Sequence, residues 1–288
     1  MIVNLLFRLL ARFPLSMLHL IGGWAGWIAY AASPSYRRRL RRHLVQAVGD
    51  VDPAVLHAAI AEAGRQAFEL PWLWLRPAEE VVAKVKRVEG WELVDAAHSE
   101  GAGIVFMTPH LGCFEVTAQY IASLTPITVL YRPPRNAALE PLMQAGRVRG
   151  RMSTAPADLS GVRRLVKTLR SREAIGMLPD QVPGSGEGVW ADFFGRPAWT
   201  MTLAARLSEV KGVHVIYCWA ERLPRGKGYV FRLSAPVEPL EGDLPARVAT
   251  MNREIERVIL KCPGQYMWGY NRYKKPRAAR EAAARAEA

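Results

Sequence analysis

The side chains most capable of chemistry are a histidine and a glutamate five residues apart, His110 and Glu115, in the segment MTPHLGCFE. His110 follows an apolar run typical of a buried strand, and Glu115 falls about one turn into the helical pattern that comes next. A bend between strand and helix can return the carboxylate to the imidazole and leave the other ring nitrogen facing a crevice. Such a pair suits a general base whose tautomer is fixed by the carboxylate. Spacing alone leaves an alternative open, a capping or packing histidine beside an unrelated acid.

The elements that would position this pair follow from the hydrophobic pattern. Short apolar runs at 103–108, 127–131, 174–178 and 213–219 alternate with amphipathic stretches at 112–122, 137–149, 160–171 and 200–210. This alternation predicts an α/β fold with a mainly parallel sheet flanked by helices. Ligands bind beyond the carboxyl ends of the strands in such sheets, so the loops after 108, 131 and 178 are expected to form the site. A further helix is expected over 52–76, although Pro71 lies inside the pattern.

The first 42 residues have the composition of a membrane-anchoring helix with a basic flank. Residues 13–36 hold no Asp, Glu, Lys or Arg, and as a helix these 24 residues would reach about 36 Å, enough for a hydrocarbon core of about 30 Å. Five arginines between Arg37 and Arg42 then mark a cytoplasmic flank. A helix lying in the interface and a cleaved signal peptide are the alternatives. The expected organisation is an anchor at 1–42, a catalytic domain at 43–276 and a disordered, basic, Ala-rich tail at 277–288.

The net charge of +13 is distributed unevenly, which argues against a uniformly basic nucleic-acid binder. Residues 1–42 contribute +7 and residues 272–288 contribute +4, whereas the 229 residues between them contribute only +2. Within that middle part, 132–172 carries +8, so acidic partners are expected there. Three widely spaced cysteines without a CxxC pair indicate neither a disulfide framework nor a zinc site. The sequence holds no evident nucleotide motif or metal-ligand cluster, and no cofactor or metal is expected.

The segment HLGCFE has the His-x4-acid pattern of the glycerolipid acyltransferase superfamily, and its context resembles the lipid A late acyltransferase branch, of the HtrB/LpxL type. Further matches to this branch follow in order along the chain: Tyr131-Arg132-Pro133, GRVR at 146–149, Pro179-Asp180-Gln181, DFFG at 192–195, Pro197 to Thr200, and PGQYMW at 263–268. The ordered series is far more specific than the His-x4-Glu pattern alone. The resemblance makes 43–276 an acyltransferase domain.

The resemblance implies transfer of a fatty acyl chain from acyl carrier protein to a hydroxyl of a lipid A precursor. It places the enzyme at the bacterial inner membrane with its catalytic domain on the cytoplasmic side. His110, paired with Glu115, would remove the proton of the acceptor hydroxyl as that hydroxyl attacks the thioester. Arg147 matches an arginine that the family needs for activity. Arg147 or Arg149 could steady the oxyanion or hold an acceptor phosphate, and a solvated helix face is the alternative for both.

Three further residues are expected to bind substrate. Arg132, in the loop after the second strand, would contact phosphates or sugar acids, and Asp180 with Gln181 would contact the acceptor, a turn-forming Asp being the alternative. No G-x-S-x-G elbow is present, since 184–188 reads GSGEG, so direct transfer is favoured, while Cys113 leaves a covalent route open. Two other functions stay open: the same chemistry on a lysophospholipid, aminolipid or glycolipid, and a non-catalytic membrane adaptor.

Overall fold

The computed structural model describes residues 2–134, 136–183 and 188–276, so the predicted tail at 277–288 and most of the GSGEG segment lie outside the described residues. The helices are α1 (Ile2–Leu10), α2 (Leu15–Ala32), α3 (Pro34–Val48), α4 (Pro53–Leu75), α5 (Ala78–Val82), α6 (Glu92–Ser99), α7 (Phe114–Leu124), α8 (Glu140–Arg147), α9 (Leu159–Arg170), α10 (Leu203–Leu207) and α11 (Leu244–Ile259). The strands are β1 (Val85–Glu89), β2 (Gly103–Met107), β3 (Ile127–Tyr131), β4 (Met152–Pro156), β5 (Ala174–Met177), β6 (Gly188–Phe193), β7 (Arg196–Met201), β8 (Val213–Arg222) and β9 (Tyr229–Ser234).

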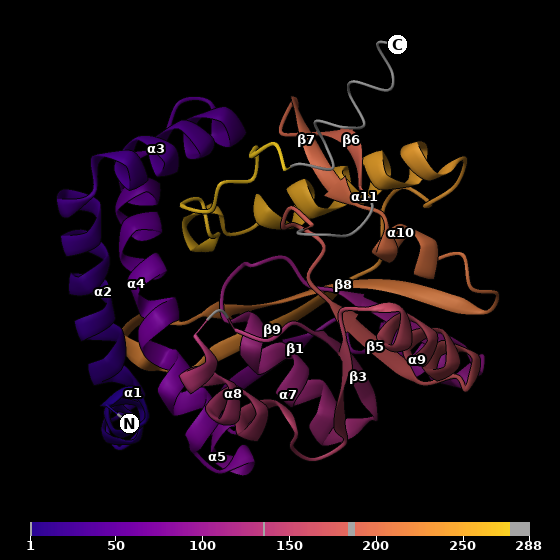
Figure 1. The fold of residues 1–288 in the computed structure, drawn as a ribbon, viewed down its shortest axis with the longest axis horizontal. Helices are drawn as coiled ribbons and strands as arrows, with labels where there is room; N and C mark the ends of the chain where they lie inside the picture. Colours follow the sequence, from indigo (N-terminus) through magenta and orange to yellow (C-terminus); the bar gives the residue numbers. More distant parts are fainter. Residues whose placement is uncertain (1, 135, 184–187, 277–288) are drawn as a thin grey trace.

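A seven-stranded sheet crosses the centre of the molecule in the order β1-β9-β8-β2-β5-β3-β4 (Figure 1). Every neighbouring pair is parallel except β8 and β9, which are antiparallel. The predicted α/β fold with a mainly parallel sheet is thereby confirmed. Because β2 and β5 are parallel neighbours, with Met107 opposite Met177, the loops that follow them leave from the same edge of the sheet.

The side chains of β2 alternate between two apolar cores, which explains why both faces of the sheet carry helices. Ile104 and Phe106 face a core that also contains residues of α6, α7 and α8. Val105 and Met107 face the opposite core, which contains residues of α9, α10 and α11. Buried on both sides, β2 reads in the sequence as a continuous apolar run, as expected for the centre of a parallel sheet.

The apolar N-terminal segment is divided by two prolines. Pro14 precedes α2 and Pro34 opens α3, so α2 is 18 residues long. Among the residues that the structure describes, no helix is both long enough and apolar enough to cross a bilayer, and the predicted membrane-spanning helix is not confirmed. The helix expected over 52–76 is confirmed as α4, with Pro71 inside it.

Helices α2 and α4 lie side by side along one end of the molecule (Figure 1). Their backbones touch at glycines: a Cβ added to Gly64 would lie 1.9 Å from the carbonyl oxygen of Gly22, and one added to Gly26 would lie 2.2 Å from that of Ile60. No side chain fits between these positions, so glycine is required for so close a helix contact. The contact fixes α2 to the helix whose far end approaches the candidate site.

Candidate active site

The loop that carries His110 begins where β2 ends and is tied to three other segments through its backbone. The amide of Thr108 donates to the carbonyl of Met177 at 3.0 Å, which joins the loop to the end of β5. The carbonyl of His110 accepts from the amide of Met267 at 3.2 Å, and the amide of Cys113 donates to the carbonyl of Ala220 in β8 at 2.8 Å. The imidazole is therefore mounted on a loop that is fixed at both ends.

The carboxylate that holds His110 comes from Asp180, three residues beyond the end of β5. Oδ1 of Asp180 lies 2.7 Å from Nδ1 of the imidazole, and Oδ2 accepts from the backbone N–H of His110 at 2.9 Å. On the other side of the ring, the amide nitrogen of Gln181 lies 3.1 Å from Nε2. With Nδ1–H donating to Asp180, the lone pair of Nε2 accepts from Gln181, which is the tautomer that a general base requires.

The expected contact of His110 with Glu115 differs from what the structure contains, because Asp180 occupies Nδ1. Glu115 lies in the first turn of α7 and is turned toward α8, where Arg147 donates to it through Nη2 and through Nε at 3.2 Å. Nε1 of Trp74, near the end of α4, donates to the same carboxylate at 3.2 Å. Gly146 makes room for this indole, since a Cβ there would lie 2.6 Å from its ring. Glu115 and Arg147 thus form one partly buried ion pair, and their predicted roles in catalysis stay predictions.

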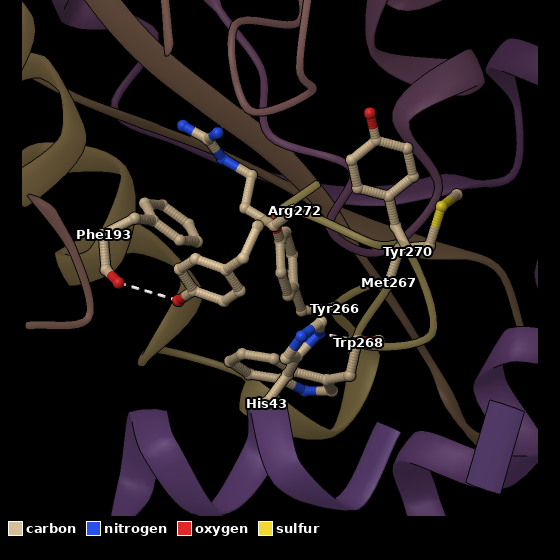
Figure 2. A pocket seen from close by; sticks show the side chains of 8 residues that line it. His43, Phe193, Tyr266, Met267, Trp268, Tyr270 and Arg272 are labelled. Atoms are coloured by element: carbon tan, nitrogen blue, oxygen red, sulfur yellow. Dashed lines mark hydrogen bonds between the residues drawn. The ribbon is translucent and has the colours of Figure 1, made fainter. Parts of the chain in front are cut away.

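Asp180 is almost completely buried, at 1% exposure, and it is stabilised as an anion by its surroundings. Burial by itself raises the pKa of this carboxyl, but the electrostatic interaction and hydrogen bonds with His110, with a further hydrogen bond from Tyr266, bring the pKa below its ordinary value. Tyr266 belongs to the segment that also provides Met267. Figure 2 shows Tyr266, Trp268 and Arg272 of this segment around a small cavity behind the site, with His43 approaching from α3.

The remaining predicted basic residues separate into two groups. Arg149 turns inward, donating to the backbone carbonyls of Ala145, Trp74 and Arg76, so its guanidinium joins α8 to the end of α4. Arg132 is exposed in the loop after β3. Substrate binding by Arg132, Arg149 and Gln181 stays a prediction, although Gln181 does reach the imidazole.

Cys113 follows His110 by three residues in the same loop. Its side chain is 1% exposed and lies among Glu69, Arg222 and Tyr229. Burial raises the pKa of the Cys113 thiol well above its ordinary value, so it is held as a thiol rather than as the nucleophilic thiolate. This burial disfavours a covalent route through Cys113.

Two residues of the site, Asp180 and Trp74, have contacts that the sequence does not predict. Asp180 was expected only to bind the acceptor, since its partner His110 is 70 residues away. Trp74 lies in a helix that shows only apolar periodicity, so its hydrogen bond to Glu115 could not be anticipated. To predict the contact of Asp180 with His110, one must know the order of the parallel strands, which brings the ends of β2 and β5 together.

With the geometry known, comparison with known proteins gives the class of the enzyme: the chain is an acyltransferase. Residues 1–275 match the model of the bacterial lipid A biosynthesis acyltransferases, and the chain belongs to this family. It is 28% identical over 280 residues to a lipid A biosynthesis acyltransferase of Haemophilus influenzae, covering 93% of this chain and 88% of that protein. It is 27% identical over 207 residues to the lipid A biosynthesis lauroyltransferase of Escherichia coli, covering 71% of this chain and 66% of that protein. A phosphatidylinositol mannoside acyltransferase of Mycobacterium tuberculosis is 24% identical over 257 residues, or 77% of this chain and 78% of that protein.

Proposed function

We propose that the chain transfers a fatty acyl group from the thioester of acyl carrier protein to a hydroxyl of a lipid A precursor, with His110 as the general base. This proposal rests on one observation: Oδ1 of Asp180 lies 2.7 Å from Nδ1 of His110. This contact directs the lone pair of Nε2 away from Asp180, toward the amide of Gln181. An acceptor hydroxyl takes the place of that amide when the substrate binds.

In the proposed reaction, Nε2 of His110 takes the hydroxyl proton while the hydroxyl oxygen attacks the thioester carbon. The C–S bond then breaks, and the leaving sulfur of the carrier protein takes the proton back from the imidazolium. Asp180 stabilises the imidazolium between the two steps. Arg147 uses two N–H groups on Glu115, and in the proposed reaction its other donors bind the oxyanion or an acceptor phosphate.

The donor is proposed to bind at α9. This helix exposes four cations beside two half-buried valines that line a surface hollow: Arg163, Arg164, Lys167 and Arg170, with Val162 and Val166. A basic face with an apolar centre fits an acidic carrier protein. Arg147 and Arg149 are turned inward, so the basic stretch 132–172 divides into an outer part for the donor and an inner part for the acceptor.

Membrane attachment is proposed to occur through α1 and α2. Opposite the glycines that contact α4, these helices expose a band of large apolar side chains: Leu5, Leu6, Leu9, Met17, Leu20, Trp24, Trp27 and Ile28. Leu5 is 70% and Trp24 67% exposed, which is unusual for such residues unless a further apolar phase covers them. The first 42 residues contain seven arginines and no acid, so the band is flanked by charges that anionic headgroups attract. The proposed location is the cytoplasmic side of the bacterial inner membrane.

The direct test is incubation of membranes holding the protein with radiolabelled acyl carrier protein thioester and a Kdo-bearing lipid A precursor. Acylation that is lost in His110→Ala, with membrane attachment unchanged, supports the proposal. A wild-type protein that does not acylate this precursor, where a positive-control enzyme does, refutes it. Equal, measurable rates in wild type and His110→Ala would refute His110 as the general base, whereas a wild type without activity that still attaches to membranes would indicate a non-catalytic adaptor.

A different glycolipid acceptor is the second candidate, because one relative is named for acylating a phosphatidylinositol mannoside. Mass spectrometry of total lipids with and without the gene separates the two candidates. Loss of one acyl chain from lipid A supports the first acceptor, and loss from another glycolipid with lipid A unchanged supports the second.

A further inference from the structure

A second group of charged side chains is buried behind the catalytic loop and takes no part in the proposed reaction. At its centre Arg222, the last residue of β8, meets Glu69 of α4, and both side chains are 1% exposed. Glu69 also accepts from the hydroxyl of Tyr229 at 3.0 Å and lies 3.1 Å from Nε2 of His19 in α2. Burial raises the pKa of Glu69, but the charge of Arg222 and the hydrogen bonds of Arg222 and His19 together outweigh this and bring the pKa to about 2, so Glu69 is ionised.

The guanidinium of Arg222 makes one contact that the ion pair itself does not require. Nε donates to both oxygens of Glu69, at 2.9 and 3.0 Å, and Nη2 donates to Oε1 at 2.5 Å. Nη1 donates to Glu62 at 3.3 Å. Nη2 also donates to the backbone carbonyl of Gly112 at 2.7 Å. This last bond reaches the loop between His110 and Glu115, two residues beyond the imidazole and three before the carboxylate.

Gly112 is the residue at which this loop turns. It has φ of +57°, and a Cβ on it would lie 2.0 Å from the carbonyl oxygen of Ala220, so the turn is made against β8. Its amide donates to the carbonyl of Gln265 at 3.1 Å, while its carbonyl is held by Arg222. The orientation of this peptide sets the direction in which His110 leaves the sheet and the direction in which α7 carries Glu115.

We propose that Arg222, oriented by Glu69, is a positioning residue that sets the catalytic loop through the carbonyl of Gly112. The proposal rests on the function proposed above and deepens it, since it assigns a role in the reaction to a residue that does not touch the substrates. The planar, forked guanidinium of Arg222 is essential, because this one side chain must bind the carboxylate of Glu69 and the carbonyl of Gly112 at the same time. A lysine can retain the charge beside Glu69 but cannot hold both partners in this geometry.

Arg222→Lys is therefore the informative variant. It keeps the buried charge paired with Glu69 and releases Gly112, so the imidazole loses its alignment while the protein remains folded. A displacement of about 1 Å costs about 10²-fold in rate, and we expect kcat per folded enzyme to fall by about that factor with KM changed less than about threefold. Glu69→Gln keeps the shape of the partner and weakens its hold on Arg222, so it should lower kcat by about tenfold.

The matched control is Arg257→Lys. Arg257 also binds a buried carboxylate, Glu254, at 2.7 Å, and a backbone carbonyl, that of Ala235, at 3.1 Å, but it contacts neither the loop nor β2. Its kcat should stay within about threefold of wild type even if its melting temperature falls, because conformational stability and alignment are separate quantities. Folded protein is measured for every variant by circular dichroism and gel filtration before rates are compared.

A readout independent of turnover completes the test. The Nδ1 proton of His110, which Asp180 accepts, should give a downfield proton NMR signal, assigned by its loss in His110→Gln. The signal should be lost or shifted in Arg222→Lys and Glu69→Gln and unchanged in Arg257→Lys. The proposal is overturned if Arg222→Lys and Glu69→Gln both keep the kcat of the wild type per folded enzyme. It is also overturned if the NMR signal is unchanged in both variants. Failure of the wild type to transfer acyl groups overturns the proposed function instead, and the NMR signal still decides whether Arg222 sets the loop.

Discussion

Replacing Asp180 with asparagine tests the central feature of the site with almost no change in shape. Two N–H donors, the backbone amide of His110 and its Nδ1–H, converge on the two oxygens of Asp180 at 2.9 and 2.7 Å. Asparagine has only one oxygen for them. If that oxygen keeps the backbone amide, the NH2 group faces Nδ1, which must then accept a hydrogen bond. The proton moves to Nε2, and the atom proposed as the base loses its lone pair.

The size of the effect follows from these two contacts. A hydrogen bond to a charged group contributes about 1.5–3 kcal/mol, and the substitution removes one such bond and reverses the other, for a total of about 3–6 kcal/mol. At about 1.4 kcal/mol for each tenfold change in rate, kcat should fall by about 10²–10⁴-fold. KM should change less than about threefold, because the substitution alters the base rather than the binding surface.

The assay is transfer from labelled acyl carrier protein thioester at saturating acceptor, with kcat referred to folded protein. Asp243→Asn serves as the control, since Asp243 is an exposed cap at the start of α11, and its kcat should match that of the wild type. An Asp180→Asn enzyme that retains wild-type kcat would refute the reasoning, because His110 would then not depend on this carboxylate. A loss confined to Glu115→Gln would restore the pairing expected from the His-x4-Glu spacing.

Three further predictions concern single side chains. In urea unfolding of Glu115→Gln, Arg147→Met and the double variant, the coupling energy between the two sites should exceed about 1 kcal/mol, because the ion pair is partly buried; additive losses would contradict it. Cys113→Ala should keep kcat within about threefold of wild type, and the native thiol should resist iodoacetamide, because burial raises its pKa; rapid alkylation with loss of activity would revive the covalent route. Burial lowers the pKa of His43 from 6.5 to about 4, so the unfolded chain binds more protons between these values and stability falls as the pH drops through them. Between pH 7 and pH 5, the melting temperature should therefore fall by at least about 2 °C more in the wild type than in His43→Asn, whose amide can still donate to the carbonyl of Trp268, and equal slopes would contradict this prediction.

The local hydrophobic pattern predicts several strands of the sheet but not the order in which they pair. The apolar runs at 103–108, 127–131, 174–178 and 213–219 correspond to β2, β3, β5 and β8, because strands buried on both faces are continuously apolar. Strand β1 is interrupted by polar residues and strand β9 runs antiparallel to β8, and neither shows a continuous apolar run. Pairing of β1 with β9, more than 100 residues later, depends on tertiary contacts that no window of the sequence contains.

The same limit applies within the site. His110 and Glu115 are visible together because they are neighbours in the sequence, and this proximity suggested that they pair. In the folded chain, the positive φ at Gly112 and the start of α7 turn Glu115 toward Arg147, while β5 delivers Asp180 to the imidazole. The sequence names these residues as candidates, but their partners in the fold depend on the strand order, which the sequence does not show.

The glycine contact between α2 and α4 has a practical consequence for work with the protein in solution. Removing an apolar N-terminal helix is a common way to obtain a protein that needs no detergent. Here a chain shortened to begin after Ala32 would expose the bare backbone at Gly64 and leave Glu69 without His19. Since Trp74, near the end of α4, donates to Glu115, such a truncation would loosen the helix that borders the site. Detergent or nanodisc preparations of the whole chain are therefore the appropriate material for measuring its catalytic rate.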